Sequence, residues 1–205
     1  MEIIKEDKVD IEKLKSELEQ GKTLAYPTET CYGLGCLANI PEAVEKVFGI
    51  KKRDKNKAVL VLVPDQTTAK EYLKWNSTLQ RLTDKFWPGD LTVVSDLKSN
   101  MGLSKLVTSD GTLAVRVSSS PTAKKITEAV DHPLVSTSAN ISGSSSPYSG
   151  TEVKNIYENK DKKPDIIIDG GELDPKPSST IVKVNGDISV IREGAVEVSQ
   201  IKEFL

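Results

Sequence analysis

Residues 58–63, AVLVLV, are the stretch of sequence that decides the fold class. The run is continuous, apolar and rich in valine, and the polar residues 51–57, KKRDKNK, precede it. Such a run is typical of a strand that is buried on both faces, as in sheets covered by helices. The sequence therefore predicts a strand inside an α/β protein.

Helical and strand patterns alternate on both sides of this run and then give way to strands in series. Asp10 can cap a helix that reaches Gln20, and Pro41 suits the first turn of a helix that ends in the KKR tract. We expect further helices at 79–86 and 121–130 and a short one closing at Leu205, strands at 23–26, 91–95, 113–118, 134–139, 165–169, 179–184 and 188–193, and a polar loop at 28–35. This order predicts a mixed sheet with helices against it.

Composition favours one domain over residues 1–205, with 37% hydrophobic and 28% charged residues. The formal net charge of −2 gives no chain-wide basic field, so a site for a polyanion would have to be a local cluster. The sequence opens without an apolar signal region, and no run approaches the length of a membrane span. We expect a cytoplasmic protein that does not contact membranes.

Several familiar catalytic patterns are absent. Cys31, Cys36 and His132 are too few for a zinc site or a disulfide framework, so we expect two buried thiols and no protein-held metal. Residues 21–23, GKT, lack the upstream glycine of a phosphate-binding loop and precede a strand. No serine elbow accompanies the single histidine, which excludes a Ser-His-Asp triad.

Four polar segments next to apolar strands are candidates for a site. Residues 27–30, PTET, could line a polar pocket or form a capping turn. The cations of 51–57 could bind an anion or be a solvated helix end. Residues 136–143, STSANISG, could wrap phosphate oxygens or form ordinary turns. Arg116 interrupts an apolar strand and needs either an internal carboxylate or a bound anion. We expect these groups to meet at the ends of adjacent strands.

The motifs that carry a family resemblance are YPTETCYGLG (26–35), KKR with Lys57 four residues later, FWPGDLT (86–92), LAVRV (113–117), STSANISG (136–143) and PSSTIV (177–182). In this order they resemble the YrdC/TsaC family of threonylcarbamoyl-AMP synthases. The resemblance implies a YrdC-like fold: a twisted, open mixed sheet flanked by helices, with a positively charged concave groove.

The resemblance also implies roles for individual residues. Lys51, Arg53, Ser138 and Asn140 match a catalytic tetrad around the nucleotide. Further positions that match ATP contacts are Lys57, Thr112, Ser146 and Arg192. Positions that match the threonine site are Thr30, Arg116, Ser136, Ser179 and Thr180. Two departures are Asp54 and the serines 118–120, where members of the family often have proline.

The implied activity is a nucleotidyltransferase that joins L-threonine, bicarbonate and ATP into L-threonylcarbamoyladenylate and releases pyrophosphate. This is the first step of the N6-threonylcarbamoyladenosine modification of tRNA at adenosine 37, which implies a functional link to the complex that transfers the group to tRNA. Mg²⁺ is expected to arrive with ATP. The alternatives are a carbamoyl-adenylate-forming carbamoyltransferase and a module that binds double-stranded RNA, weakly or as its main role.

Overall fold

The computed structural model describes residues 1–98 and 101–203. Its helices are α1 (Ile11–Glu19), α2 (Pro41–Lys51), α3 (Gln66–Tyr72), α4 (Ser77–Phe86), α5 (Pro121–Ala129), α6 (Gly150–Tyr157) and α7 (Val198–Glu203). Its strands are β1 (Glu2–Lys5), β2 (Leu24–Pro27), β3 (Tyr32–Gly35), β4 (Leu60–Leu62), β5 (Leu91–Asp96), β6 (Thr112–Arg116), β7 (Leu134–Ser138), β8 (Ile166–Asp169), β9 (Thr180–Asn185) and β10 (Asp187–Arg192). Two 3-10 helices lie at Glu6–Lys8 and Ser109–Gly111.

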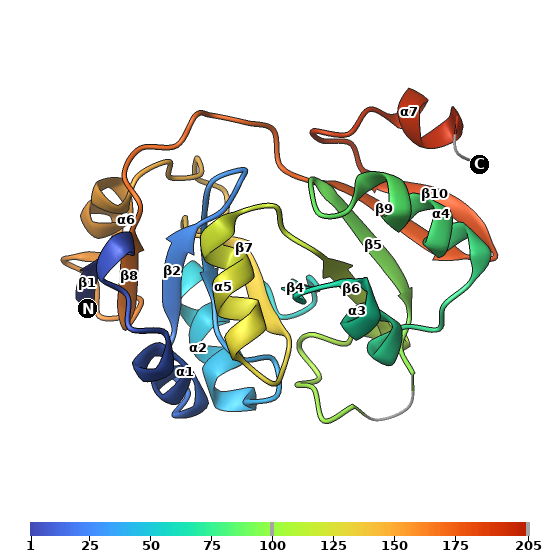
Figure 1. Cartoon of the computed structure of the whole chain (residues 1–205). Helices are drawn as coiled ribbons and strands as arrows, with labels where there is room; N and C mark the ends of the chain where they lie inside the picture. The colour runs from blue at the N-terminus through green and yellow to red at the C-terminus, as the bar shows by residue number, and fades with distance from the viewer. Residues whose placement is uncertain (99–100, 204–205) are drawn as a thin grey trace.

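The strands form one mixed sheet in the order β1-β8-β2-β3-β7-β4-β6-β5-β9-β10. Neighbours are parallel in β1/β8, β8/β2, β4/β6 and β5/β9, and antiparallel in the other pairs. The two edge strands lie toward opposite ends of the molecule, near the two termini (Figure 1). The predicted mixed sheet flanked by helices is confirmed.

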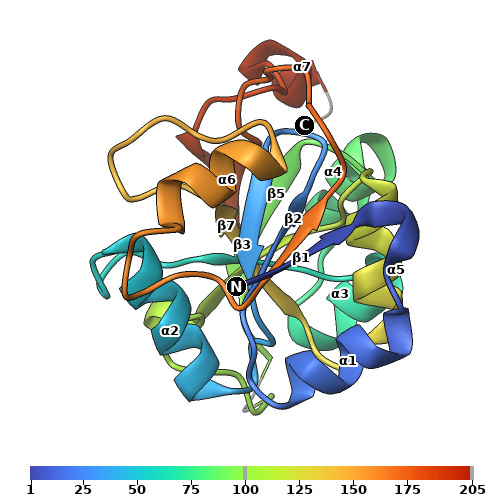
Figure 2. The same cartoon turned by 90° about the vertical axis from the view of Figure 1, so that its left-hand side faces the viewer.

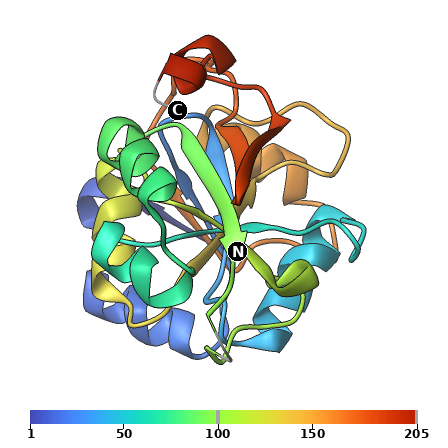
Figure 3. The same ribbon diagram turned by 90° about the vertical axis from the view of Figure 1, so that its right-hand side faces the viewer.

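The helices cover both faces of the sheet. α2 and α6 lie on one face, and α1, α3, α4 and α5 lie on the other (Figures 2 and 3). Asp10 caps α1 by accepting hydrogen bonds from the backbone N–H groups of Glu12 and Lys13, and Pro41 opens α2. Both predicted helix starts are confirmed.

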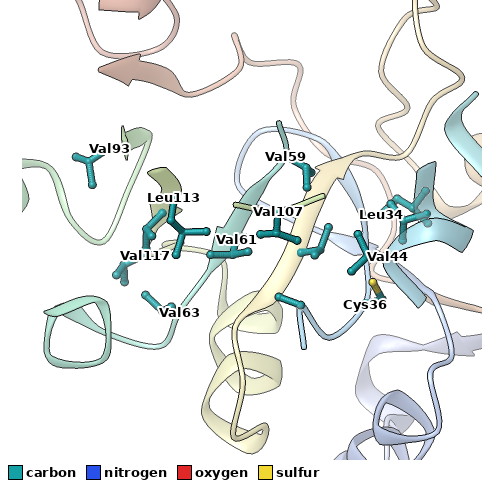
Figure 4. Close-up of a cluster of buried hydrophobic side chains, with 14 of the residues drawn as sticks. Leu34, Cys36, Val44, Val59, Val61, Val63, Val93, Val107, Leu113 and Val117 are labelled. Atoms are coloured by element: carbon teal, nitrogen blue, oxygen red, sulfur yellow. The ribbon is translucent and has the colours of Figure 1, made fainter. Parts of the chain in front are cut away.

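Strand β4 is buried on both faces, as the AVLVLV run predicts. Val61 belongs to the larger apolar cluster, whereas Leu62 belongs to the cluster under α1 and α5. Figure 4 shows Val61 in the middle of the larger cluster, with Leu113 on one side and Val44 on the other. The strand itself is shorter than predicted, since only Leu60–Leu62 are paired.

Two strands and two α-helices of the described structure were not predicted from the sequence. The loop expected at 28–35 is wrong in part, because Tyr32–Gly35 form strand β3 between β2 and β7. Strand β1 and the helices α3 and α6 were also missed; all three are short. The last helix ends at Glu203, and its expected end at Leu205 lies outside the described residues.

Candidate active site

A cavity of about 820 Å³ lies across one face of the sheet. Its floor is made by alternate residues of the strands, because side chains two positions apart in a strand point to the same face. Thr112, Ala114 and Arg116 come from β6, Ser136 and Ser138 from β7, and Ile181 and Lys183 from β9. One strand thus contributes up to three lining side chains.

This location differs from the expected meeting of strand ends. Strand β7 runs antiparallel to β4, whereas β6 runs parallel to β4, so the ends of these strands point in opposite directions. Ser136 pairs with Leu60 and Arg116 pairs with Leu62. The predicted residues therefore meet across the strands, on the face of the sheet.

Lys51, the last residue of α2, is 1% exposed. Its ammonium donates to the backbone oxygen of Ser138, to the backbone oxygen of Asn140 at 2.9 Å and to Oδ1 of Asn140 at 3.1 Å. Burial, followed by the charge of Arg53, lowers the pKa of Lys51 to about 8. All three ammonium protons therefore have acceptors, at the end of β7 and in the loop that follows it.

The side chains of Ser138 and Asn140 continue this network. The hydroxyl of Ser138 donates to Oδ1 of Asn140 at 2.6 Å, and the amide nitrogen of Asn140 donates to the backbone oxygen of Ser144. These bonds fix the direction of the amide. Lys51, Ser138 and Asn140, predicted as part of a tetrad, are therefore in direct contact.

Arg53 and Lys57 lie where this network meets the main cavity. The guanidinium of Arg53 donates to the backbone oxygens of Lys57 at 3.1 Å and Ala58 at 2.5 Å. A second cavity of about 360 Å³ is lined by all four tetrad residues and by Lys57. Arg53, Lys57 and Ser138 line both cavities. The tetrad residues are thus brought together around the second cavity.

Arg116 is 4% exposed and lines the main cavity. Its Nη1 lies 3.5 Å from Oε1 of Glu29, so the internal carboxylate that we considered for a buried arginine is present. Its Nε is buried and has no hydrogen-bond partner in the described part of the chain. Arg116 therefore has a carboxylate partner at Nη1 and no described partner at Nε. An internal carboxylate and a bound anion are thus compatible as partners of this arginine.

The PTET segment forms both a turn and part of the cavity wall. The hydroxyl of Thr28 donates to the backbone oxygen of Cys31 at 2.6 Å and lies 3.2 Å from the hydroxyl of Thr30. These bonds close the turn between β2 and β3, and Thr30 lines the cavity. Cys31 and Cys36 are buried free thiols, as predicted.

Ser136 and Tyr26 form a buried hydroxyl pair, in which the phenol donates to Oγ of Ser136 at 2.9 Å. Burial raises the pKa of Tyr26, so the phenol keeps its proton. The proton of the Ser136 hydroxyl remains free to bond a ligand acceptor in the cavity that Ser136 lines.

Arg192 and Ser179 both line the main cavity and are in contact with each other. The guanidinium of Arg192 donates to the backbone oxygen of Ser179 at 3.1 and 2.7 Å. Burial, and then the charges of Arg116 and Arg53, lower the pKa of Arg192. The guanidinium groups of Arg53, Arg116 and Arg192 therefore line one cavity.

Two predicted residues do not line either cavity. Thr180 is fully buried, and its hydroxyl donates to the backbone oxygen of Val196 at 2.5 Å. Burial raises the pKa of the Cys31 thiol, and Ser146 is close enough to that thiol to oppose this with a smaller, lowering effect. Thr112 does line the main cavity.

The serines at 118–120 are a departure from the family pattern. Their hydroxyl groups connect the loop between β6 and α5 to the end of β2 and the turn after it. The hydroxyl of Ser118 donates to the carboxylate of Glu29, and the hydroxyl of Ser120 donates to the backbone oxygen of Pro27 at 3.0 Å. Ser120 also caps α5. Asp54, the other departure, accepts a hydrogen bond from the backbone of Asn56 in a tight turn.

Sequence reasoning missed Glu29 and Lys183. Lys183 lines the cavity from β9, where its alternation with Ile181 could have indicated the face. Among the described residues, no group of three or more His, Cys, Asp or Glu side chains could hold a metal ion. The described part of the chain also contains no helix with the length and apolarity needed to span a membrane.

The fold and the cavity define a class, namely open-sheet α/β proteins with a cavity on the face of the sheet that arginine and hydroxyl side chains line. The chain belongs to the Sua5/YciO/YrdC family, whose model, described as telomere recombination, matches residues 16–194. It is 36% identical to a relative from Methanocaldococcus jannaschii over 96% of this chain and 91% of that protein.

A second relative is the threonylcarbamoyl-AMP synthase of Pyrococcus abyssi, with 31% identity over 92% of this chain. This chain spans 55% of the length of that relative. The crystal structure of P. abyssi Sua5 complexed with L-threonine superposes with a TM-score of 0.89 and 29% identity, over 100% of this chain and 61% of that one. The predicted family is thereby confirmed.

Proposed function

We propose that this protein synthesises L-threonylcarbamoyladenylate from L-threonine, bicarbonate and ATP. The cavity with three arginines and a wall of hydroxyl groups is the observation that carries this proposal. The relative named threonylcarbamoyl-AMP synthase and the similar structure with bound L-threonine support it. We further propose that residues 1–205 act as one catalytic unit, with MgATP as the substrate form.

The reaction needs two bond-forming steps. The amine of threonine adds to bicarbonate and water is lost, which gives a carbamate. A carbamate oxygen then attacks the α-phosphorus of ATP, and the bond to the β-phosphate oxygen breaks to release pyrophosphate. Neither step requires a protein nucleophile, so the protein contributes positioning and charge neutralisation.

The predicted residues fit these tasks. Arg53, Lys57 and Arg192 would bind phosphate oxygens, and the Lys51-braced pair Ser138 and Asn140 would orient the nucleotide. Residues for the threonine part are Thr30, Arg116, Ser136 and Ser179, all of which line the main cavity. Thr112 would contact the nucleotide from the floor. Ser146 and Thr180 would act from behind the lining.

The product is a mixed anhydride with phosphate, which water hydrolyses. We therefore propose that a tRNA-modifying transferase in the cytoplasm consumes it, as the step that adds threonylcarbamoyl to adenosine 37. RNA binding by this chain would be weak, since the net charge is −2.

The test is pyrophosphate release by the pure protein with MgATP, L-threonine and ¹³C-bicarbonate, combined with mass spectrometry of the product. We expect release to depend on both threonine and bicarbonate, and the adenylate to carry the ¹³C label. Controls omit threonine or use degassed, bicarbonate-free buffer. Equal rates without bicarbonate would indicate an ordinary aminoacyl-adenylate and would refute the proposal.

A further inference from the structure

Glu29 lies behind the cavity wall, in the turn between β2 and β3. Its side chain is 8% exposed, and the residue does not belong to the described lining of the main cavity. Oε1 lies 3.5 Å from Nη1 of Arg116 and accepts a hydrogen bond from the backbone N–H of Ser119 at 3.4 Å. Oε2 accepts a hydrogen bond from the hydroxyl of Ser118. The carboxylate is therefore held from two sides and in turn holds Arg116.

The contact with Glu29 determines which edge of the Arg116 guanidinium stays available. Nη1 is occupied by Glu29, whereas Nε is buried without a partner among the described residues. A buried donor without a partner is destabilising, so native proteins rarely keep one without a reason. Because Arg116 lines the cavity, a ligand acceptor can satisfy this nitrogen.

We propose that Glu29 and Ser118 are positioning residues, which together hold the guanidinium of Arg116 so that its Nε edge receives the carboxylate of the amino-acid substrate. This role rests on the proposed function. Two parallel hydrogen bonds from arginine to a carboxylate require a fixed planar fork. A long side chain that is free to rotate would lose this geometry, and the ion pair with Glu29 prevents the rotation.

The experiment compares Glu29→Ala, Glu29→Gln and Ser118→Ala with the wild-type protein. L-Threonine and ATP are titrated separately by calorimetry, and the KM for threonine is measured from pyrophosphate release. The control is Glu17→Ala, because Glu17 is another nearly buried carboxylate, paired with Lys22 at 2.8 Å on α1. Thermal unfolding is recorded for every variant.

We expect Glu29→Ala to weaken threonine binding about tenfold, at the lower end of the effect of losing a charged hydrogen bond, and to leave ATP binding unchanged. Glu29→Gln should restore part of the affinity, since it keeps the side-chain length and an oxygen beside Nη1 of Arg116 but loses the charge of the ion pair. Ser118→Ala should weaken threonine binding less than Glu29→Ala does, because Arg116 and Ser119 still hold Glu29. Glu17→Ala should change only the stability.

Unchanged threonine affinity in a folded Glu29→Ala protein would overturn the positioning role. A parallel loss of threonine and ATP binding would indicate a purely structural role and would overturn it as well. If Glu29→Ala does not fold, Glu29→Gln and Ser118→Ala provide the same comparison. A wild-type protein that binds no threonine would overturn the proposed function itself, and this role with it.

Discussion

The substitution Lys51→Met distinguishes two effects of the buried charge. One is its cost to the free energy of unfolding, and the other is its contribution to activity. Lys51 is 1% exposed, and methionine keeps an unbranched apolar chain in the same space. Lowering the pKa of Lys51 from 10.5 to about 8 corresponds to about 3 kcal/mol against the charged form, at 1.36 kcal/mol per pKa unit. Methionine removes this cost.

Methionine also leaves the backbone oxygens of Ser138 and Asn140 without the ammonium, at roughly 1–3 kcal/mol each. The two effects oppose each other, so at pH 7 we expect the free energy of unfolding to fall by only about 0–3 kcal/mol. Activity should fall much further, because Ser138 at the end of β7 and Asn140 in the following loop lose their contacts with the ammonium.

The pH dependence of stability gives the sharper measurement. Between about pH 8 and 10.5 the unfolded state binds more protons at Lys51 than the folded state does. This lysine therefore makes the wild-type protein more stable as the pH rises through that window, by about 3 kcal/mol in total, and Lys51→Met lacks the gain. Urea unfolding of both proteins at several pH values tests this, with Lys46→Met as the control on an exposed position of α2. A constant difference between wild type and Lys51→Met from pH 7 to 10 would refute the reasoning.

Three further predictions concern other parts of the site. Arg53→Ala should weaken ATP binding by roughly 1.5–3 kcal/mol, the value of a charge-assisted hydrogen bond. The control is Lys160→Ala on an exposed loop, and equal calorimetric affinities would make the basic tract a solvated helix end. Arg116→Lys should raise the KM for threonine about ten- to a hundredfold at unchanged ATP affinity, since a point charge cannot replace a fork. Unfolding, or a joint loss of both ligands, would instead assign Arg116 a structural role. Gly35→Ala should destabilise the fold by about 3 kcal/mol or more, because a Cβ would lie 2.0 Å from the backbone oxygen of Val135; an unchanged melting temperature would contradict this packing.

The same glycine shows why strand β3 was missed. Gly33 and Gly35 weaken the strand signal, and sequence alone cannot reveal that the backbone of β7 approaches so closely that only glycine fits. AVLVLV was recognised because burial on both faces leaves an unbroken apolar run. Strand β1 leaves no such pattern, since it lies at an edge and is mostly exposed.

Motif resemblance supplied the residues that we propose for the site, whereas the contacts among them could not be predicted from the sequence. A buried arginine predicts a partner, and 30 acidic residues were available for Arg116. Only the pairing of the strands places Glu29 beside it. In the same way, the basic tract predicts that Lys51 binds phosphate. In the structure its ammonium instead donates to the backbone oxygens of Ser138 and Asn140.

The arrangement of the hydrogen-bond donors agrees with a reaction in which one substrate attacks another directly, without a nucleophile from the protein. Cys31 lines the cavity, but burial raises the pKa of its thiol, so it stays protonated and is a poor nucleophile. The hydroxyl of Ser136 accepts a hydrogen bond from the phenol of Tyr26, and no hydrogen bond from Ser136 to a basic side chain is present among the described residues. What the cavity offers instead are guanidinium groups and hydroxyl groups that are already fixed by bonds to their neighbours. Donors that need no rearrangement stabilise charge on phosphate and carbamate oxygens most effectively. Transfer of an adenylyl group to a carbamate, with no covalent enzyme intermediate, is the chemistry that such a site can support.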